Sequence, residues 1–166
     1  MSQPEIDRGP RRWRPGLALL LWPLLGACLG TLDFVDPEVG APLADRCTNA
    51  DSEIGRDVSF KNDVLPILKG QAGPVGCSCH QPTAPDPIGF EQTGLDLSSY
   101  AGLRAGGGRS SATIVIPGRP CESVFWQKMS AGPPFGSRMP FNGPPFVPEE
   151  QRRLIADWIA EGARDN

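Results

Sequence analysis

The sequence predicts a mainly α-helical domain in which three or more short helices are joined by long loops rich in glycine and proline. The first observation is periodicity, because three segments between residues 58 and 163 repeat apolar side chains at helical intervals. The second is composition, since 20 glycines and 19 prolines among 166 residues interrupt the chain between helical segments. The length suits one ordinary domain, which typically has about 100 to 200 residues.

Residues 1–27 have the features of a removable signal peptide. Four arginines precede the run GLALLLWPLLGA, whose twelve residues are too few to span a bilayer as a helix. The run ends in Leu-Gly-Ala-Cys, which resembles the lipobox of bacterial lipoproteins and implies cleavage before Cys28 and acylation of that residue. An ordinary secretory signal with a chance cysteine is the alternative. The lipoprotein interpretation predicts anchoring to a membrane of the bacterial cell envelope, facing the periplasm or cell surface. Leu29, by resemblance to other lipoproteins, favours the outer membrane.

Removal of residues 1–27 leaves an acidic chain. It takes away four of the 16 basic residues and two of the 19 acidic ones, so the net charge becomes −5. An acidic domain without a cluster of lysine and arginine argues against nucleic acid as a partner. Export also brings Cys47, Cys77, Cys79 and Cys121 into an oxidising compartment, where thiols end in disulfides or covalent attachments.

The exported chain is predicted to start with a lipid anchor and a flexible tether over residues 28–57, with Cys47 as the one anchor point of the tether. The domain, over residues 58–166, opens with VSFKNDVLPILKG. Ser59 can cap a short helix there, and Phe60 and Val64 begin its apolar face, while Pro66 limits its regularity. Residues 70–119 are predicted as loop, and the glycine run at 106–108 lacks the Gly-Lys-Ser/Thr of a phosphate-binding loop.

Two more helices are predicted in the last third of the chain. In PCESVFWQKM, Pro120 fits the first helical position, and Val124, Phe125 and Met129 can share one face. The clearest helix covers residues 148–163, with an apolar stripe made of Leu154, Ile155, Trp158 and Ile159. Short helices and long loops bury little apolar surface, so a covalent or bound group would supply what the core lacks.

The stretch VGCSCHQP holds two of the five cysteines and the only histidine. In the common haem signature C-x-x-C-H, two thiols add to haem vinyl groups and the adjoining imidazole binds the iron. Cys79 and His80 keep the second half of this signature, but Gly76 stands where the first cysteine should be. Cys77 comes one residue late, which shortens its reach by up to about 3.5 Å, so whether it bonds to haem stays open.

The order of several segments resembles the small single-haem c-type cytochrome domains of exported bacterial proteins. These segments are FKNDVLPIL, Cys-His, GLDLSSYAGL, IVIPGRPCESVFWQKM, RMPF and PEEQRRLIADWIAEGA, and together they cover roughly residues 58 to 163. The resemblance implies a cytochrome c-like fold around one haem c. The haem would be attached through Cys79, with Cys77 as a second candidate, and ligated by His80.

The second axial ligand in this interpretation is a methionine, whose soft thioether favours reduced iron. Met139 lies in a loop, and Pro140 restricts its backbone to extended conformations, whereas Met129 lies on a helix face, where methionine more often fills the core. We therefore expect Met139 as the ligand. The single histidine excludes bis-histidine haem ligation, two-histidine zinc fingers and blue-copper sites with two histidines.

The remaining cysteines predict a disulfide. If Cys77 and Cys79 both hold haem, Cys47 and Cys121 remain as a pair; if Cys77 is free, three thiols compete for one disulfide.

The main hypothesis is a lipid-anchored electron-transfer protein with His80 and Met139 as axial ligands, and hence no enzyme. Its partners are the membrane and an unidentified redox protein. The first alternative is a haem-free module on the same scaffold, with its cysteines in disulfides, acting as a structural or interaction lipoprotein. A weaker alternative is a copper(I) or zinc site.

Overall fold

The computed structural model describes residues 47–166, so the predicted signal peptide, Cys28 and most of the predicted tether lie outside the described residues. Within this range five α-helices are joined by loops and single helical turns, and no strand is present. None of these helices has the length and apolar character needed to cross a membrane. The mainly α-helical fold class is thus confirmed. The helices are α1 (Leu65–Leu68), α2 (Ile88–Thr93), α3 (Tyr100–Ala105), α4 (Val124–Met129) and α5 (Glu149–Ala160).

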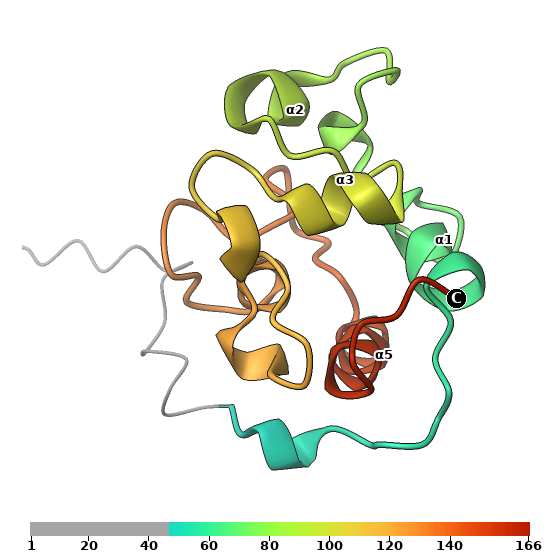
Figure 1. Ribbon diagram of the computed structural model, residues 1–166. Helices are drawn as coiled ribbons and strands as arrows, with labels where there is room; N and C mark the ends of the chain where they lie inside the picture. The colour runs from blue at the N-terminus through green and yellow to red at the C-terminus, as the bar shows by residue number, and fades with distance from the viewer. Residues whose placement is uncertain (1–46) are drawn as a thin grey trace, which may run out of the picture. The chain divides into compact units, whose positions relative to one another are not determined.

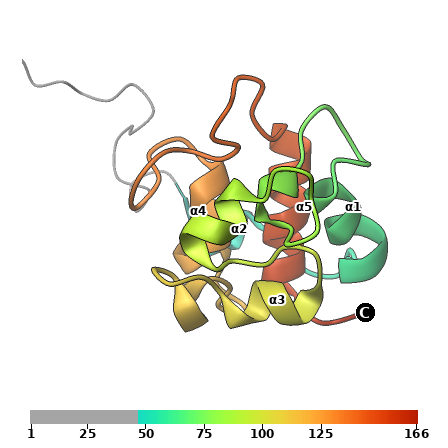
Figure 2. The ribbon, with the colours of Figure 1, turned by 90° about the horizontal axis from the view of Figure 1, so that it is seen from above.

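Helix α5 is the central element and lies between α1 and α4 (Figures 1 and 2). Its buried face includes Ile155, Trp158 and Ile159, as the apolar stripe predicts. The ring of Phe60 lies 5.4 Å from that of Trp158 and 5.3 Å from that of Tyr100, so three aromatic residues from distant segments form one cluster. The helix ends at Ala160, three residues earlier than predicted.

The first predicted helix is present, and its cap is confirmed. The hydroxyl of Ser59 accepts a hydrogen bond from the backbone N–H of Asn62 at 3.1 Å. The chain then forms a π-helical turn over Phe60–Val64 that leads directly into α1. Phe60 and Val64 are both buried, which places this short helix against the core.

The second predicted helix is interrupted. A 3-10 turn covers Pro120–Glu122, and α4 begins only at Val124. Between them Ser123 is fully buried and extended, because its hydroxyl accepts from the N–H of Ile116 at 2.8 Å and donates to the carbonyl of Arg119 at 2.9 Å. These bonds tie the residue to the preceding loop and prevent it from continuing a helix.

The middle segment, predicted as loop, contains α2 and α3. The hydroxyl of Ser99 accepts from the N–H of Gly102 at 3.1 Å and caps α3. Only Leu103 of α3 is buried, and α2 buries no residue completely. Helices of six residues with so little buried surface leave no periodic signal.

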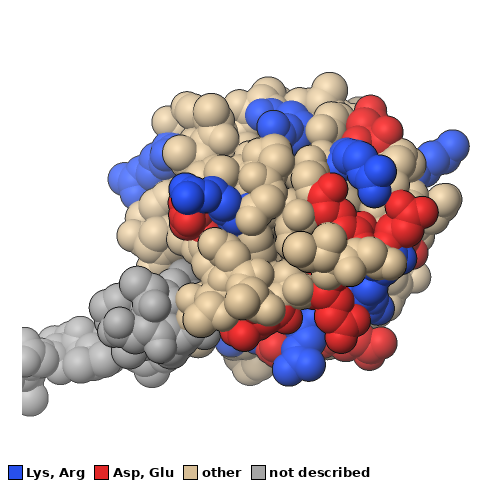
Figure 3. Space-filling model, turned by 60° about the horizontal axis from the view of Figure 1, so that its bottom comes forward, with Lys and Arg blue, Asp and Glu red and all other residues tan. Residues whose placement is uncertain are grey.

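Residues 47–58, which we call the strap, run along the lower edge of Figure 1 and are fastened to α5. The buried carboxylate of Asp157 accepts from the N–H of Glu53 at 2.7 Å and pairs with Arg56 at 2.9 Å. One turn later, Glu161 accepts hydrogen bonds at 2.8 to 2.9 Å from the N–H groups of Gly55, Asp57 and Val58. The described end of the predicted tether is therefore bonded to the domain. Figure 3, which brings this side forward, shows acidic side chains gathered there with basic ones among them.

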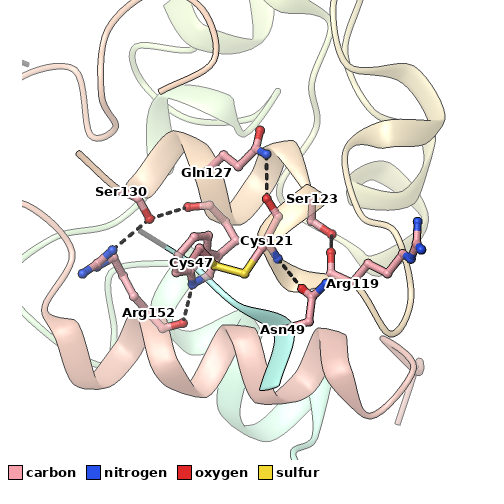
Figure 4. Close-up of a disulfide and its surroundings, with 9 residues drawn as sticks. Cys47, Asn49, Arg119, Cys121, Ser123, Gln127, Ser130 and Arg152 are labelled. Atoms are coloured by element: carbon pink, nitrogen blue, oxygen red, sulfur yellow. Dashed lines mark hydrogen bonds between the residues drawn. A yellow bond between two sulfur atoms is a disulfide. The ribbon is translucent and has the colours of Figure 1, made fainter. Parts of the chain in front are cut away.

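The strap is also covalently attached. Cys47 and Cys121 form a disulfide with their Cα atoms 5.8 Å apart, which confirms the predicted pair (Figure 4). The N–H of Cys121 donates to the side chain of Asn49 at 2.9 Å, and Gln127 donates to the carbonyl of Cys121 at 2.7 Å. The bridge thus joins the start of the strap to the turn that precedes α4.

The bonds of Glu161 predict that the strap loosens in acid. Burial alone would raise the pKa of Glu161, but the backbone N–H groups of the strap outweigh it and lower the pKa below 4.5. Because the folded pKa is the lower one, the stabilisation is present above about pH 4.5 and is lost as the pH falls through the folded value. We expect protection of amides 53–58 from hydrogen exchange to fall in the same range.

The Glu161→Gln variant should weaken the strap already at neutral pH, with a loss of about 1 kcal/mol in the free energy of unfolding. Glu150→Gln is the matched control, because Glu150 is exposed on the first turn of the same helix. Equal amide protection in the two variants would contradict the role given to Glu161.

Candidate functional site

The candidate site is a mainly apolar cavity of about 510 Å³. This volume falls within the roughly 300 to 1,000 Å³ typical of ligand and cofactor sites. Its walls come from the 3-10 turn Ser78–His80, the end of α2, α4 and the loop after α4. The apolar side chains that line it are Leu95, Leu97, Ile114, Val124, Phe125, Met129, Phe135, Met139 and Phe141. A second cavity, of about 490 Å³ beside the disulfide, is lined by neither histidine nor methionine.

His80 lines this cavity and is held by α2. Thr93 donates its one hydroxyl hydrogen to the carbonyl of Gly89 at 2.5 Å, while its oxygen lies 3.4 Å from Nδ1 of His80. The hydroxyl oxygen can therefore serve only as an acceptor toward the ring, so this contact is a hydrogen bond in the tautomer that carries its proton on Nδ1. A Cβ atom at Gly89 would lie 3.0 Å from two ring carbons, so the backbone of α2 packs directly on the imidazole.

The imidazole of His80 is neutral at physiological pH. Burial lowers the pKa of His80; a hydrogen bond with the backbone of Leu95 opposes this effect, and the charge of Lys128 adds to the lowering. With a pKa below the ordinary 6.5, the ring is neutral at physiological pH. Neutral imidazole is the form that binds metal ions.

The two free cysteines occupy different environments. Cys77 lines the cavity and packs against the core, whereas Cys79 is exposed and does not line the cavity. Burial, together with the neighbouring Cys79, raises the pKa of the Cys77 thiol to about 12, so it is protonated at neutral pH. The structure therefore brings Cys77 and His80 together and leaves out Cys79, the residue that the sequence pattern favours.

Gly76 stands at the position of the first cysteine in the haem signature, and its place in the fold explains why it is glycine. A Cβ atom there would lie 2.6 Å from the Cα and 2.7 Å from the backbone nitrogen of Gly70. The backbone segments at Gly70 and Gly76 thus approach each other too closely for a side chain at position 76. A cysteine at this position would require the backbone to move.

Met139 lines the cavity from the loop after α4. Its N–H donates to the carbonyl of Lys128 at 2.7 Å, and Arg138 donates to the carbonyl of Met129 at 3.0 Å. The ammonium group of Lys128 in turn donates to the carbonyls of Phe135, at 2.7 Å, and Ser137. The last turn of α4 therefore holds the loop that carries Met139 through hydrogen bonds to four of its residues, Phe135, Ser137, Arg138 and Met139.

Met129 has a different setting, although it also lines the cavity. Its side chain is 2 % exposed and belongs to the hydrophobic core, as its position on a helix face indicates. Met139 is only partly buried. Met129 is therefore part of the packed core, whereas Met139 contributes less to it.

Two basic residues of the site have no signal in the sequence. Among residues 47–166, Arg109 and Lys128 are the only charged side chains that line the cavity. Both lie against the ring of Phe135, at 5.8 and 5.1 Å from its centre. Burial and the charge of Arg109 lower the pKa of Lys128. This end of the cavity is positively charged.

Among residues 47–166 no group of three or more His, Cys, Asp or Glu side chains is arranged to hold a metal ion. No protein-family model, no curated protein and no solved structure matches the chain. The functional assignment therefore depends on the residues and geometry of the cavity.

Proposed function

We propose that this chain is an electron-transfer protein that carries one haem c in the cavity, with His80 and Met139 as axial ligands. The observation that carries the proposal is that one mainly apolar cavity is lined by the only histidine, a loop methionine and a free thiol. Histidine and methionine are the axial pair found in cytochromes c. When bound, haem supplies one-electron chemistry at its iron.

The residues of the cavity fit this group. The neutral imidazole of His80 would bind iron through a ring nitrogen, and the thioether of Met139 would favour the reduced metal. Apolar walls exclude water, and the positive end formed by Arg109 and Lys128 suits the two carboxylates of haem. Ligation by both His80 and Met139 would leave no coordination site for a substrate, so the proposal is electron transfer rather than catalysis.

The location and partners belong to the same proposal. Acylation of Cys28 would anchor the domain to a membrane of the bacterial cell envelope, facing the periplasm or cell surface, with the outer membrane favoured by Leu29. The partner would be a second redox protein. The order of arginines, apolar run and Leu-Gly-Ala-Cys supports the membrane anchor, and the acidic net charge argues against nucleic acid as a partner.

The test is the absorption spectrum of the full chain made in a host with haem-attachment machinery. We expect the spectrum of a c-type cytochrome and a band that stains for haem on a denaturing gel. His80→Ala should lose the low-spin spectrum. A colourless protein from a host that matures other c-type cytochromes would contradict the proposal and favour the haem-free structural or interaction lipoprotein.

A second candidate is a copper(I) protein, because the soft sulfur donors of Cys77, Met129 and Met139 line one cavity with the imidazole of His80. The cavity is larger than a bare ion requires, which favours the organic group. Competition with a chromophoric copper(I) chelator distinguishes the two. The copper candidate requires one tightly bound ion that His80→Ala releases.

A further inference from the structure

We infer that the thiol that attaches haem in this chain is Cys77, and that Cys79 stays outside the cavity. The inference rests on the proposed function and reverses the assignment that the C-x-C-H pattern favours. The proposed modification is a single thioether between Cys77 and a vinyl group of haem. Three observations carry it: the type of helical turn, the anchoring of Cys77 and the close packing at Gly76.

The turn that holds His80 is 3-10 rather than α-helical. The N–H of His80 donates to the carbonyl of Cys77 at 2.9 Å, which closes a turn over Ser78–His80 with Cys77 at its start. A 3-10 turn has 3.0 residues, so side chains three positions apart lie one above the other. Cys77 and His80 therefore share a face, while Cys79 is rotated away by about 120°.

The lining of the cavity agrees with this geometry. Cys77 and His80 both line it, and Cys79 is exposed elsewhere. In a regular C-x-x-C-H signature the two thiols are four and one residues before the histidine. In the 3-10 turn of this chain, a cysteine three residues before the histidine lies on the face of the histidine.

Cys77 is fixed in this orientation by the core. Its N–H donates at 2.8 Å to the carbonyl of Leu68, a residue that is completely buried. The preceding residue, Gly76, lies too close to Gly70 to be replaced by a cysteine without a backbone shift. The usual position of the first attachment thiol is therefore closed, and Cys77 is the adjacent residue that reaches the cavity.

The chemistry of attachment needs only a reduced thiol and a vinyl group. The S–H bond of Cys77 adds across the vinyl C=C bond. Sulfur bonds to the carbon next to the ring, and the thiol hydrogen passes to the terminal carbon, which becomes a methyl group. No electrons are gained or lost. Cys77 is a free thiol in the structure, as this step requires.

The test begins with the unaltered haem-loaded protein. Trypsin leaves both cysteines in one peptide, residues 70–104, because no lysine or arginine lies between Lys69 and Arg104. Fragmentation of this peptide at Ser78 separates them, and we expect the mass of one haem on the fragment with Cys77 and an unmodified Cys79. Haem on Cys79, or on both cysteines, would overturn the inference while leaving the proposed function intact.

Two matched variants and one haem-free measurement complete the test. Cys79→Ser should retain covalent haem on a denaturing gel, whereas Cys77→Ser should lose at least about nine tenths of it. In haem-free protein, iodoacetamide should alkylate exposed Cys79 at least tenfold faster than partly buried Cys77. Equal alkylation rates would contradict the different exposure of Cys77 and Cys79, on which the inference rests. A complete absence of haem from the unaltered protein and both variants would instead reject the proposed function and the attachment with it.

Discussion

Replacing Met139 by alanine should change the spectrum and the reduction potential of the haem, whereas replacing Met129 by alanine should change neither. In haem-loaded protein, Met139→Ala should abolish the weak near-infrared band that sulfur ligation gives oxidised iron and should lower the reduction potential. Loss of a soft ligand removes its preference for reduced iron, which is the reason for the lower potential. Met129→Ala should leave the band and the potential nearly unchanged.

In haem-free protein, Met129→Ala should lower the free energy of unfolding more than Met139→Ala. Met129 is 2 % exposed, and truncating a buried methionine to alanine costs about 2 to 5 kcal/mol in the free energy of unfolding. Met139 lies partly exposed in a loop, so the same truncation should cost about 1 kcal/mol or less in haem-free protein. Denaturant unfolding of both haem-free variants measures this difference.

A matched variant separates ligation from packing. Met139→Leu keeps an apolar side chain of similar volume but removes the sulfur, so it should lose the band while it preserves the loop. A band that survives in Met139→Ala and disappears in Met129→Ala would transfer the ligand role to Met129.

Breaking the disulfide between Cys47 and Cys121 should lower the free energy of unfolding strongly. The bridge closes a loop with a sequence separation of 74 residues. By the chain-entropy estimate, such a loop stabilises the folded state by about 4 kcal/mol. The variant with both cysteines changed to serine should therefore unfold at a much lower denaturant concentration, with the difference measured against the oxidised parent.

Two controls define this experiment. Cys79→Ser removes a thiol that is exposed and free, so it should leave the free energy of unfolding within about 0.5 kcal/mol. Each single serine variant at position 47 or 121 should behave like the double variant, because either change removes the same bond. Peptide mapping without reduction should recover residues 47 and 121 in one linked fragment; a link from either to Cys77 would refute the pairing.

The sequence predicted those features that depend on neighbouring residues. The apolar stripe of α5 and the cap at Ser59 each involve residues within a few turns of one another, so the spacing of residues in the sequence predicts both. The interruption at Ser123 was not predicted, because the hydroxyl binds backbone groups of a loop that only the fold brings close. The same applies to the strap, whose partners on α5 lie more than 100 positions further along the chain.

In the candidate site too, the sequence predicts some residues, while others depend on the fold. His80 was found because it is the only histidine and adjoins a cysteine, and Met139 because of its loop setting. The different settings of Cys77 and Cys79 depend on the type of turn, which a C-x-C-H pattern does not specify. Lys128 has no signal in the sequence, because a lysine in a short helix is usually solvated. In this fold its ammonium group donates to loop carbonyls beside the cavity.

The disulfide also determines which part of the domain carries mechanical load. A pull on the chain that precedes Cys47, resisted at α5, passes through the bridge to Cys121 and continues along the residues that follow it. Residues 48–120, which include His80, lie outside this covalent path. The loop of Met139 lies within it, so tension along the covalent path would act on the methionine side of the cavity and not on the histidine side.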